Sequence, residues 1–364
     1  MNIDISEIKQ LLTTIRDPRT GTNIVQAGIV KDVLLQGNDL AIQIYSSNMD
    51  STDKGNLTQA IVFSIQATYP ELEVNIQMVN RAPDIQDRPS PLPQVKNIIA
   101  VGSGKGGVGK STISVGLAFA LNRLGYKVGL LDADIYGPSI PTMLGLKGKR
   151  PPITNVYGKT KLMPIDVNGV QTMSIGNIIE PDQAVVLRGP RLTGIIKQFI
   201  EDTVWEELDF MIIDLPPGTG DIQLTLVQTV PLSGAVIVTT PQEVAFADAL
   251  RAMNMFRMDQ INVPIIGVIE NMAWFTPREL PDNKYFIFGE GGGERLAKLS
   301  HSSILGQVPL IMGLRESGDQ GTAYKTDKEG HNSKIFEEVG KNLILQLNKV
   351  LALQGRAKIV EIKS

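Results

Sequence analysis

The spacing of hydrophobic residues changes near residue 97. From there to residue 353, short continuous apolar runs alternate with segments whose apolar residues recur every three or four positions. The first kind predicts buried strands and the second predicts helices. The predicted strands are residues 97–102, 127–132, 170–175, 209–214, 235–240, 265–270 and 304–308, and the predicted helices are 112–124, 190–205, 243–258, 292–300 and 334–353. This alternation predicts an α/β fold with a mostly parallel sheet flanked by helices.

The first 82 residues predict a small α+β domain. Apolar residues at helical spacing indicate helices over residues 6–15 and 56–68. Strand-like runs are residues 28–35, 40–45 and 72–79. Gly37 and Asn38 suit a tight hairpin between the first two runs.

Three further segments complete the predicted organisation. Residues 82–96 contain four prolines, and because proline fixes φ and lacks a backbone donor, residues 83–96 are expected to be a stiff linker. Asn168 and Gly169 lie between the runs 162–165 and 170–175, which predicts a hairpin that decorates the larger domain. The predicted units are therefore residues 1–82, a linker over 83–96, a main domain over 97–353 and a tail over 354–364.

A glycine-rich stretch between a predicted strand and a predicted helix carries the most specific chemical signal. Residues 104–111 read GKGGVGKS and match the phosphate-loop pattern G-x-x-x-x-G-K-[ST]. Glycines let successive backbone N–H groups approach phosphate oxygens, and the helix start adds free N–H groups. The predicted nucleotide-binding residues here are Gly104, Lys105, Gly106, Gly107, Val108, Gly109, Lys110, Ser111 and Thr112. Lys110 is expected to bridge the β- and γ-phosphates of ATP, and Ser111 to ligate Mg²⁺.

The same stretch also satisfies a weaker pattern. Gly102, Gly104 and Gly107 spell G-x-G-x-x-G, and Asp132 ends the second predicted strand, which is the outline of a dinucleotide site. A dinucleotide-binding turn has no use for the Lys110–Ser111 pair, so the sequence favours a triphosphate site.

Three aspartates follow predicted strands. Asp132 and Asp134 lie just past the second strand, and Asp214 ends the run FMIID before PPGTG. Ligands bind at the carboxyl ends of parallel strands, and Mg²⁺ prefers few carboxylates with several waters. The predicted metal ligands are therefore Ser111, Asp132 and Asp214, whereas Asp134 is expected to orient the attacking water. The glycines of PPGTG suit a loop that follows the γ-phosphate.

Composition restricts the chemistry further. The 364-residue chain has a net charge of −3, so no strongly basic nucleic-acid surface is expected. It has no cysteine, which excludes disulfides and thiolate-ligated zinc or iron–sulfur sites within the chain. Its two histidines, His301 and His331, lack metal-site spacing and are expected to be surface residues. Without a leader-like start or an apolar run of the ~20 residues needed to cross a bilayer, we expect a cytoplasmic protein with no membrane span.

These motifs together resemble the Mrp/ApbC family of P-loop ATPases, which is related to MinD and ParA. The resemblance rests on residues 97–146, LRGPRL (187–192), DLPPGTGD (214–221), TTPQEVAFAD (239–248) and GVIENM (267–272). Residues 1–82 resemble the small domain that often precedes such ATPases and is shared with SufT-type assembly factors.

The resemblance implies a function and a set of site residues. It implies ATP hydrolysis at a deviant Walker A site, a homodimer with ATP at its interface, and iron–sulfur cluster binding and transfer to apoprotein clients. Lys105 matches the lysine that reaches the partner's phosphates in deviant Walker ATPases. The expected catalytic residues are then Lys105, Lys110 and Asp134, and Asn271 matches the expected adenine contact.

The chain departs from the family pattern after the ENM segment. Cluster-holding members generally place C-x-x-C there, and two subunits share one cluster through those thiolates. Residues 273–293 instead read AWFTPRELPDNKYFIFGEGGG, whose aromatics are expected to pack a β-excursion, with a partner-binding surface as the alternative. Lack of cysteine argues against a bound cluster, so two functions stay open. One is an iron–sulfur assembly ATPase that uses other ligands, and the other is an ATP-gated switch or targeting factor that binds a protein partner without iron. Met253, Met255 and Met258 are expected to pack within a helix rather than bind metal.

Overall fold

The chain forms two compact units, Met1–Pro93 and Gln94–Ser364. The computed structural model describes residues 4–16, 23–46, 49, 51–79, 91–156, 159–178, 189–258, 261–277, 279–325 and 331–353. Much of the predicted linker and all of the predicted tail lie outside these residues, as do Leu187 and Arg188 of LRGPRL. The predicted linker ends too late, because Val95 and Lys96 already belong to the first strand of the second unit.

The first unit packs two helices on a three-stranded sheet. Its elements are α1 (Ile5–Leu12), β1 (Val30–Gln36), β2 (Asp39–Tyr45), α2 (Ser51–Gln66) and β3 (Glu73–Val79). β1 pairs antiparallel with β2 across a turn in which Gly37 has a φ of 64°, and β2 pairs parallel with β3. Leu57, Ile61 and Ile65 on one face of α2 enter the core of this unit. α2 begins at Ser51, five residues before the predicted start at residue 56.

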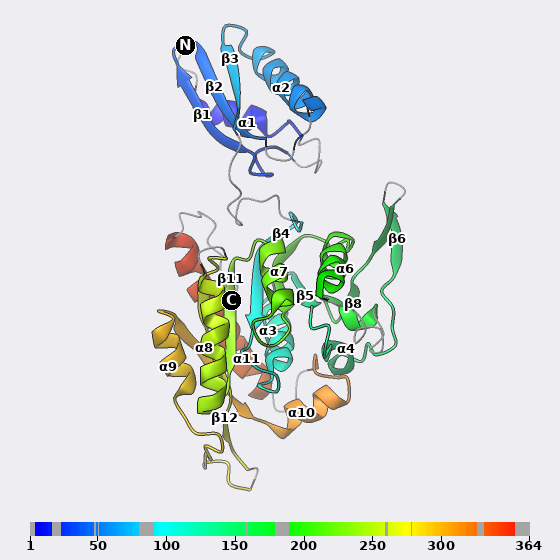
Figure 1. Cartoon of the computed structure of the whole chain (residues 1–364), viewed down its shortest axis with the longest axis vertical. Coiled ribbons are helices and arrows are strands. Elements are labelled where there is room, and N and C mark those ends of the chain that lie inside the picture. The colour runs from blue at the N-terminus through cyan, green and yellow to red at the C-terminus, as the bar shows by residue number, and fades with distance from the viewer. Residues whose placement is uncertain are drawn as a thin grey trace. The chain divides into compact units, whose positions relative to one another are not determined.

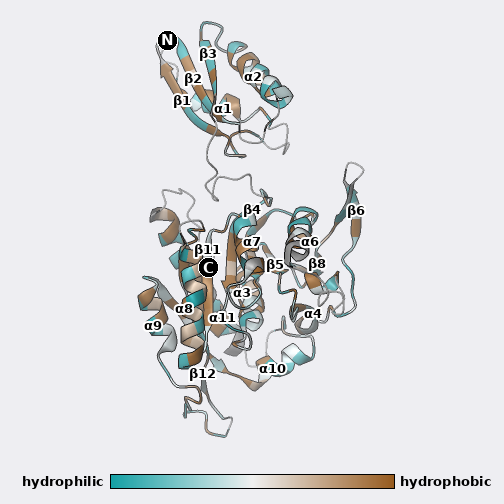
Figure 2. Cartoon of the chain, viewed as in Figure 1, coloured by the Kyte–Doolittle hydropathy of each residue, from teal (hydrophilic) through white to brown (hydrophobic). Residues whose placement is uncertain are grey.

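The second unit contains an eight-stranded sheet in the order β13-β12-β11-β4-β10-β5-β9-β8. The strands are β4 (Val95–Gly102), β5 (Val128–Asp132), β8 (Ile165–Val167), β9 (Val170–Ser174), β10 (Leu208–Asp214), β11 (Gly234–Thr239), β12 (Ile265–Phe275) and β13 (Ser303–Leu310). All neighbouring strands run parallel except β8 and β9. Figure 2 shows hydrophobic residues along the central strands β4 and β11. The predicted α/β fold is confirmed, although β12 continues beyond the predicted end at Glu270.

Helices cover the sheet on both sides (Figure 1). On one side α3 (Lys110–Arg123) packs against α11 (His331–Leu353), and on the other α8 (Glu243–Arg257) packs against α9 (Gly292–Leu299). α6 (Gly189–Glu201) packs against α7 (Asp221–Thr229). The hydrophobic pattern did not predict α7, α4 (Ile140–Met143) or α10 (Met312–Asp319). α10 spans only eight residues and buries none of them, so it adds few apolar positions to the sequence pattern. None of the described helices is long and apolar enough to pass through a membrane.

The predicted hairpin at Asn168 and Gly169 exists, but its placement was wrong. These residues have φ values of 50° and 86°, as a tight turn of the primed type requires, and they join β8 to β9. β9 also pairs parallel with β5, so this hairpin extends the main sheet rather than decorating it. Leu162 instead ends β7 (Lys159–Leu162), which forms a separate hairpin with β6 (Ile153–Val156).

Strand register brings the polar strand ends together. Asp214 of β10 lies opposite Asp132 of β5, and Asp132 lies opposite Ser174 of β9. On its other side Asp214 lies opposite Val101 of β4, just before the glycine-rich loop. The parallel sheet therefore places these side chains in one row at its carboxyl edge, which is where such sheets bind ligands.

Candidate functional site

The glycine-rich loop connects β4 to the start of α3 and borders a cavity. Gly107 and Gly109 have φ values of 83° and 80°, a left-handed conformation that side chains disfavour. Gly109 also precedes the first residue of α3 and offers no side-chain cap, so the first N–H groups of the helix are available to an anion. The cavity has a volume of about 480 Å³ and is lined by this loop together with Thr112, Asp134 and Tyr136.

Gly104 is required for a different reason. A Cβ atom at Gly104 would lie 2.0 Å from the backbone carbonyl of Asp248 in α8. This position therefore needs glycine so that the loop can pack against α8. The sequence pattern suggested only a phosphate contact for this residue.

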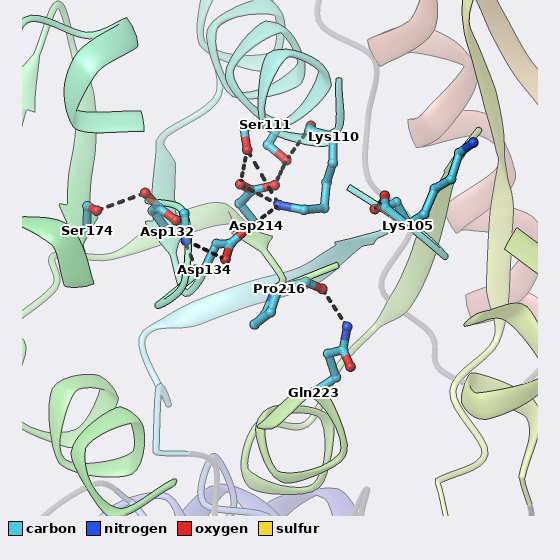
Figure 3. A network of polar contacts seen from close by, with 12 residues as sticks. Lys105, Lys110, Ser111, Asp132, Asp134, Ser174, Asp214, Pro216 and Gln223 are labelled. Carbon is cyan, nitrogen blue, oxygen red and sulfur yellow. Dashed lines mark hydrogen bonds and ion pairs between the residues drawn. The ribbon is translucent and has the colours of Figure 1, made fainter. Parts of the chain in front are cut away.

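Lys110 lies at the centre of the buried charges (Figure 3). Its Nζ atom is 2.8 Å from Oδ2 of Asp214 and 3.6 Å from Oδ2 of Asp134. The Lys110 side chain is only 6% exposed, so these ion pairs are poorly screened by water. A triphosphate entering the cavity would offer this ammonium a stronger anionic partner than Asp214.

Asp214 accepts hydrogen bonds from two serines of α3. Ser111 Oγ donates to its Oδ2 at 2.6 Å, and Ser114 Oγ donates to its Oδ1 at 2.7 Å. Asp214 is therefore a fully satisfied buried carboxylate that orients the Ser111 hydroxyl. Ser114 lies one helical turn beyond Lys110 and was not singled out from the sequence, although that spacing places it on the same helix face.

Asp132 is completely buried beside β9. Its Oδ2 accepts from Ser174 Oγ at 2.8 Å, and its Oδ1 accepts from the backbone N–H of Asp134 at 3.1 Å. Burial, followed by the nearby negative charge of Asp214, raises the pKa of Asp132 to about 8. Ser174 was not predicted from the sequence either, and only the register of β5 and β9 identifies it.

Asp134 borders the cavity. Burial is the main reason that its pKa is raised, and the positive charge of Lys110 opposes that rise. Its Oδ1 accepts from the backbone N–H of Gly137 at 3.2 Å. Of the three predicted aspartates, Asp134 alone is among the residues that line the cavity.

The PPGTG loop after β10 is held to the phosphate loop and to α7. The N–H of Gly218 donates to the carbonyl of Ser103 at 2.9 Å. Gln223 of α7 holds both ends of the PPGTG loop, because its Nε2 donates to the carbonyl of Pro216 at 2.6 Å and its Oε1 accepts from the N–H of Gly220. Gln223 is a third site residue that the sequence did not indicate.

Lys105 and Asn271 are the two predicted site residues that lie away from Lys110 and the aspartates. Lys105 is half-buried, and Figure 3 shows its side chain extending away from Lys110 and the aspartates. Asn271 is 5% exposed, and its Nδ2 donates to the carbonyl of Val108 at 2.8 Å. Its predicted contact with adenine stays a prediction.

The described residues contain no pre-formed cluster of metal-ligating side chains, and Asp132, Asp134 and Asp214 are no exception. Within the part of the chain that the structure describes, no three His, Asp or Glu side chains are grouped closely enough to hold a metal ion. His301 is exposed, whereas the side chain of His331 lies outside the described part.

Met253 and Met255 are buried in the packing of α8, as expected. The expectation was wrong for Met258, which follows the last residue of α8 and is 45% exposed.

Family models match both units. Residues 94–344 match the model described as NUBPL iron-transfer P-loop NTPase, and residues 5–76 match that of an iron–sulfur cluster assembly protein. The chain belongs to the NUBPL-type P-loop NTPase family. The predicted resemblance to nucleotide-binding iron–sulfur carriers is thereby confirmed.

Individual relatives agree with this assignment. An iron–sulfur cluster carrier protein from Synechocystis is 43% identical over 341 residues, which cover 92% of this chain and 95% of the relative. One from Escherichia coli is 47% identical over 70% of this chain and 67% of the relative. A nucleotide-binding protein from Archaeoglobus fulgidus, solved with ADP, has 36% identity and a TM-score of 0.56 over 68% of this chain and 94% of its own. The MinD ATPase of Pyrococcus furiosus shares the fold at a TM-score of 0.50 with 20% identity, over 68% of this chain and 98% of its own.

Proposed function

We propose that this NTPase is a Mg²⁺-dependent cytoplasmic ATPase that acts as a homodimer in iron–sulfur cluster assembly. One observation carries the proposal: three loop glycines (Gly106, Gly107 and Gly109), Lys110 and Asp134 all border one cavity at the carboxyl edge of the sheet. The named activity of its relatives supports the assembly role.

The residues around the cavity suit a triphosphate and its metal. Backbone N–H groups of residues 104–112 hold the phosphates, and Lys110 moves its ion pair from Asp214 to the β- and γ-phosphates. Ser111 would hold Mg²⁺, and Asp214 and Asp132 would support it from the neighbouring strands. When bound, Mg²⁺ neutralises negative charge on the phosphate oxygens.

Asp134 is proposed to orient the attacking water. Its position on the cavity wall supports this role, and so does its raised pKa, because a more basic carboxylate accepts a proton more readily. Asn271 is proposed to bind adenine through its carboxamide oxygen, since its nitrogen donates to Val108.

Lys105 is proposed to act on the partner's nucleotide. Its side chain extends away from the chain's own Lys110 and aspartates. A lysine supplied by the partner subunit would stabilise transition-state charge much as an arginine finger does, an effect of about 10³–10⁵ in rate.

The first test compares two lysine variants. Lys110→Ala is expected to abolish ATP turnover and weaken Mg·ATP binding, because the main cation facing the phosphates is lost. Lys105→Ala is expected to lower turnover by at least about 10³-fold while Mg·ATP still binds. Turnover assays and calorimetry measure both effects, with the exposed Lys147→Ala as control. Unchanged turnover in both variants would refute the mechanism.

Mixing the two variants tests the dimer. In a mixed dimer, the Lys105→Ala subunit keeps its own Lys110 and receives Lys105 from the Lys110→Ala subunit. Because one of its two sites is then complete, an equal mixture is expected to regain about a quarter of wild-type turnover under random exchange. A mixture that stays inactive would show that Lys105 does not act across the dimer.

The iron–sulfur role needs a separate test, because this chain has no cysteine. That absence favours a second candidate, an ATP-gated switch or targeting factor that binds a protein partner without iron. Anaerobic reconstitution with iron and sulfide, followed by iron counting and a visible spectrum, separates the two. Bound iron with a cluster spectrum supports a carrier that transfers clusters to apoprotein clients through other ligands. A colourless protein whose ATP turnover rises with an assembly partner supports the switch.

A further inference from the structure

β12 contacts the phosphate loop through Asn271 and leads into a projecting segment. After Asn271 the strand leaves its regular register with β13, and Met272 adopts a φ of 56°. A non-glycine residue in this left-handed conformation costs about 1–3 kcal/mol and persists only where its surroundings hold it. Residues 273–277 and 279–291, which include the last three residues of β12, then form an excursion. Figure 1 shows the part after β12 in yellow, projecting beyond the strand. The strained position therefore separates the regular strand from the excursion.

Asn271 attaches this point of β12 to the phosphate loop. Its buried Nδ2 donates to Val108 O at 2.8 Å. A Cβ atom at Gly109 would lie only 2.2 Å from the same Nδ2. The approach of Asn271 thus requires glycine at 109, and any rotation of the Val108–Gly109 peptide changes this hydrogen bond.

Glu270, the preceding residue, attaches the same point to α9. Its side chain is fully buried; its Oε2 accepts from the N–H of Gly293 at 2.6 Å, and its Oε1 accepts from Nε2 of Gln307 at 2.8 Å. Gly291 at the start of α9 provides no side-chain cap. The Glu270 carboxylate therefore caps this helix from the neighbouring strand and interacts favourably with its dipole.

These two residues hold both ends of the excursion. Asn271 bonds the strand before its start to the phosphate loop, and Glu270 bonds to Gly293 just after its end. Near its start, Phe275 and Tyr285 exchange two backbone hydrogen bonds of 2.9 Å, and Lys284 Nζ lies 4.1 Å from the centre of the Trp274 ring. Its other end leads directly into α9 and the Glu270 cap. Tyr285, Phe286 and Ile287 on the excursion are 45–59% exposed. A movement of Asn271 with the phosphate loop would thus reach both ends of a largely exposed apolar segment.

We propose that Glu270 and Asn271 form a relay that couples nucleotide binding at the phosphate loop to the conformation of residues 273–291. The relay rests on the proposed function, because it requires the loop to bind Mg·ATP. Phosphates that draw the loop N–H groups inward also reorient the Val108 carbonyl, and Asn271 follows it. Glu270 moves with its neighbour and shifts the start of α9. Both are positioning residues in this coupling.

The two tryptophans of the chain allow a direct test. Trp205 is buried near β10, whereas Trp274 lies in the excursion beside Lys284. In a Trp205→Phe background, Trp274 emission is expected to change when Mg·ATP binds, because the distance to the Lys284 charge changes. Hydrogen exchange of residues 273–299 in the unmodified protein, with and without Mg·ATP, provides a second measurement that needs no substitution.

Glu270→Gln is the decisive variant, because glutamine lacks the second carboxylate oxygen and its negative charge. We expect Mg·ATP affinity to stay within about tenfold of wild type while the emission change falls by at least half. Glu294→Gln is the matched control, because Glu294 is an exposed glutamate in α9, the helix that Glu270 caps. This variant should keep the full emission change. Asn271→Ala should lose the response and also bind Mg·ATP more weakly.

Calorimetry on the same samples separates the possible failures. Mg·ATP binding without any change in Trp274 emission or hydrogen exchange would overturn the relay and leave the ATPase proposal intact. A full response in Glu270→Gln would also overturn it. No Mg·ATP binding to the wild-type protein would overturn both. If Glu270→Gln fails to fold, the exchange measurement on the unmodified protein decides.

Discussion

At the scale of single residues, the site gathers three carboxylates around one ammonium group. Asp132, Asp134 and Asp214 approach Lys110 from adjacent strand ends, and Asp132 is fully buried. A buried negative charge is expensive unless it is paired or protonated. The protein meets this cost at Asp214 with three donors, and at Asp132 with a raised pKa. This arrangement makes the nucleotide-free protein sensitive to pH.

The sign of that pH dependence follows from Asp132. Its pKa is about 8 in the folded protein and near its ordinary value of 3.8 when unfolded. Between these values the folded state binds one more proton, so its stability is greatest below the unfolded pKa and falls as pH rises toward 8. The loss is at most about 1.4 kcal/mol per pH unit.

Asp132→Asn is expected to flatten this dependence, because asparagine keeps an acceptor for Asp134 N–H and gains a donor for Ser174 without a charge. Thermal unfolding of the nucleotide-free protein between about pH 5 and 8 should therefore show a smaller fall in Tm than wild type. Asp319→Asn, at an exposed position of α10, serves as the control. An equal or steeper fall in Asp132→Asn would contradict the assignment.

At the scale of elements, α3 is positioned by close packing against α11. Gly116 of α3 faces the buried ring of Phe336, and a Cβ atom there would lie 2.1 Å from a ring carbon. Gly340 of α11 faces Leu124 and Ala120, where an added Cβ would make ordinary contacts at 3.5–3.7 Å. Because α3 carries Lys110 and Ser111 at its start, this interface also fixes the position of the phosphate loop.

These two glycines therefore form a matched pair with opposite expected effects. Gly116→Ala should lower stability by about 1–3 kcal/mol, because Phe336 must move in a close-packed core. Gly340→Ala should raise stability by up to about 1 kcal/mol, since alanine is the better helix former. Denaturant unfolding measures both, and adding Phe336→Leu to Gly116→Ala should restore part of the loss. Equal effects at both positions would contradict the packing argument.

At the scale of the whole molecule, the hydrophobic core of the first unit is separate from the buried clusters of the second. Among the described residues, the core of the first unit includes Ile61. In the second unit one cluster surrounds α3 and α11, and α8 buries Met253 and Phe256 on the other side of the sheet. Because each unit has a core of its own, we expect damage in the core of one unit to leave the other unit folded.

Two positions of α2 test this independence. Ile61 is fully buried, whereas Phe63 on the same helix is 79% exposed. Ile61→Ala is expected to destabilise the first unit by about 2–5 kcal/mol, and Phe63→Ala to change stability by no more than about 0.5 kcal/mol. Hydrogen exchange of the full chain should show faster exchange in residues 5–79 of Ile61→Ala and unchanged rates in the second unit. Faster exchange throughout would show that the units unfold together.

The sequence by itself determined the type of fold and the phosphate loop. Alternating runs of continuous and periodic hydrophobicity depend only on which residues face the core, so they predicted the parallel strands of the large sheet and most long helices correctly. The short antiparallel strands β6, β7 and β8 were not predicted. Gly107, Gly109, Lys110 and Ser111 were recognisable because their spacing is set by local backbone geometry at the start of one helix. Short elements such as the eight-residue α10, which buries no residue, contribute too few apolar positions to be predicted in this way.

Only the tertiary structure decided which distant residues meet. Ser174 approaches Asp132 because β9 pairs with β5, and Gln223 holds the PPGTG loop because α7 starts beside it. Gly104 must be glycine because α8 passes close to it, and Glu270 caps a helix that begins 22 residues later at Gly292. Such contacts depend on strand order, register and helix packing, which are non-local and which no spacing within a single sequence encodes.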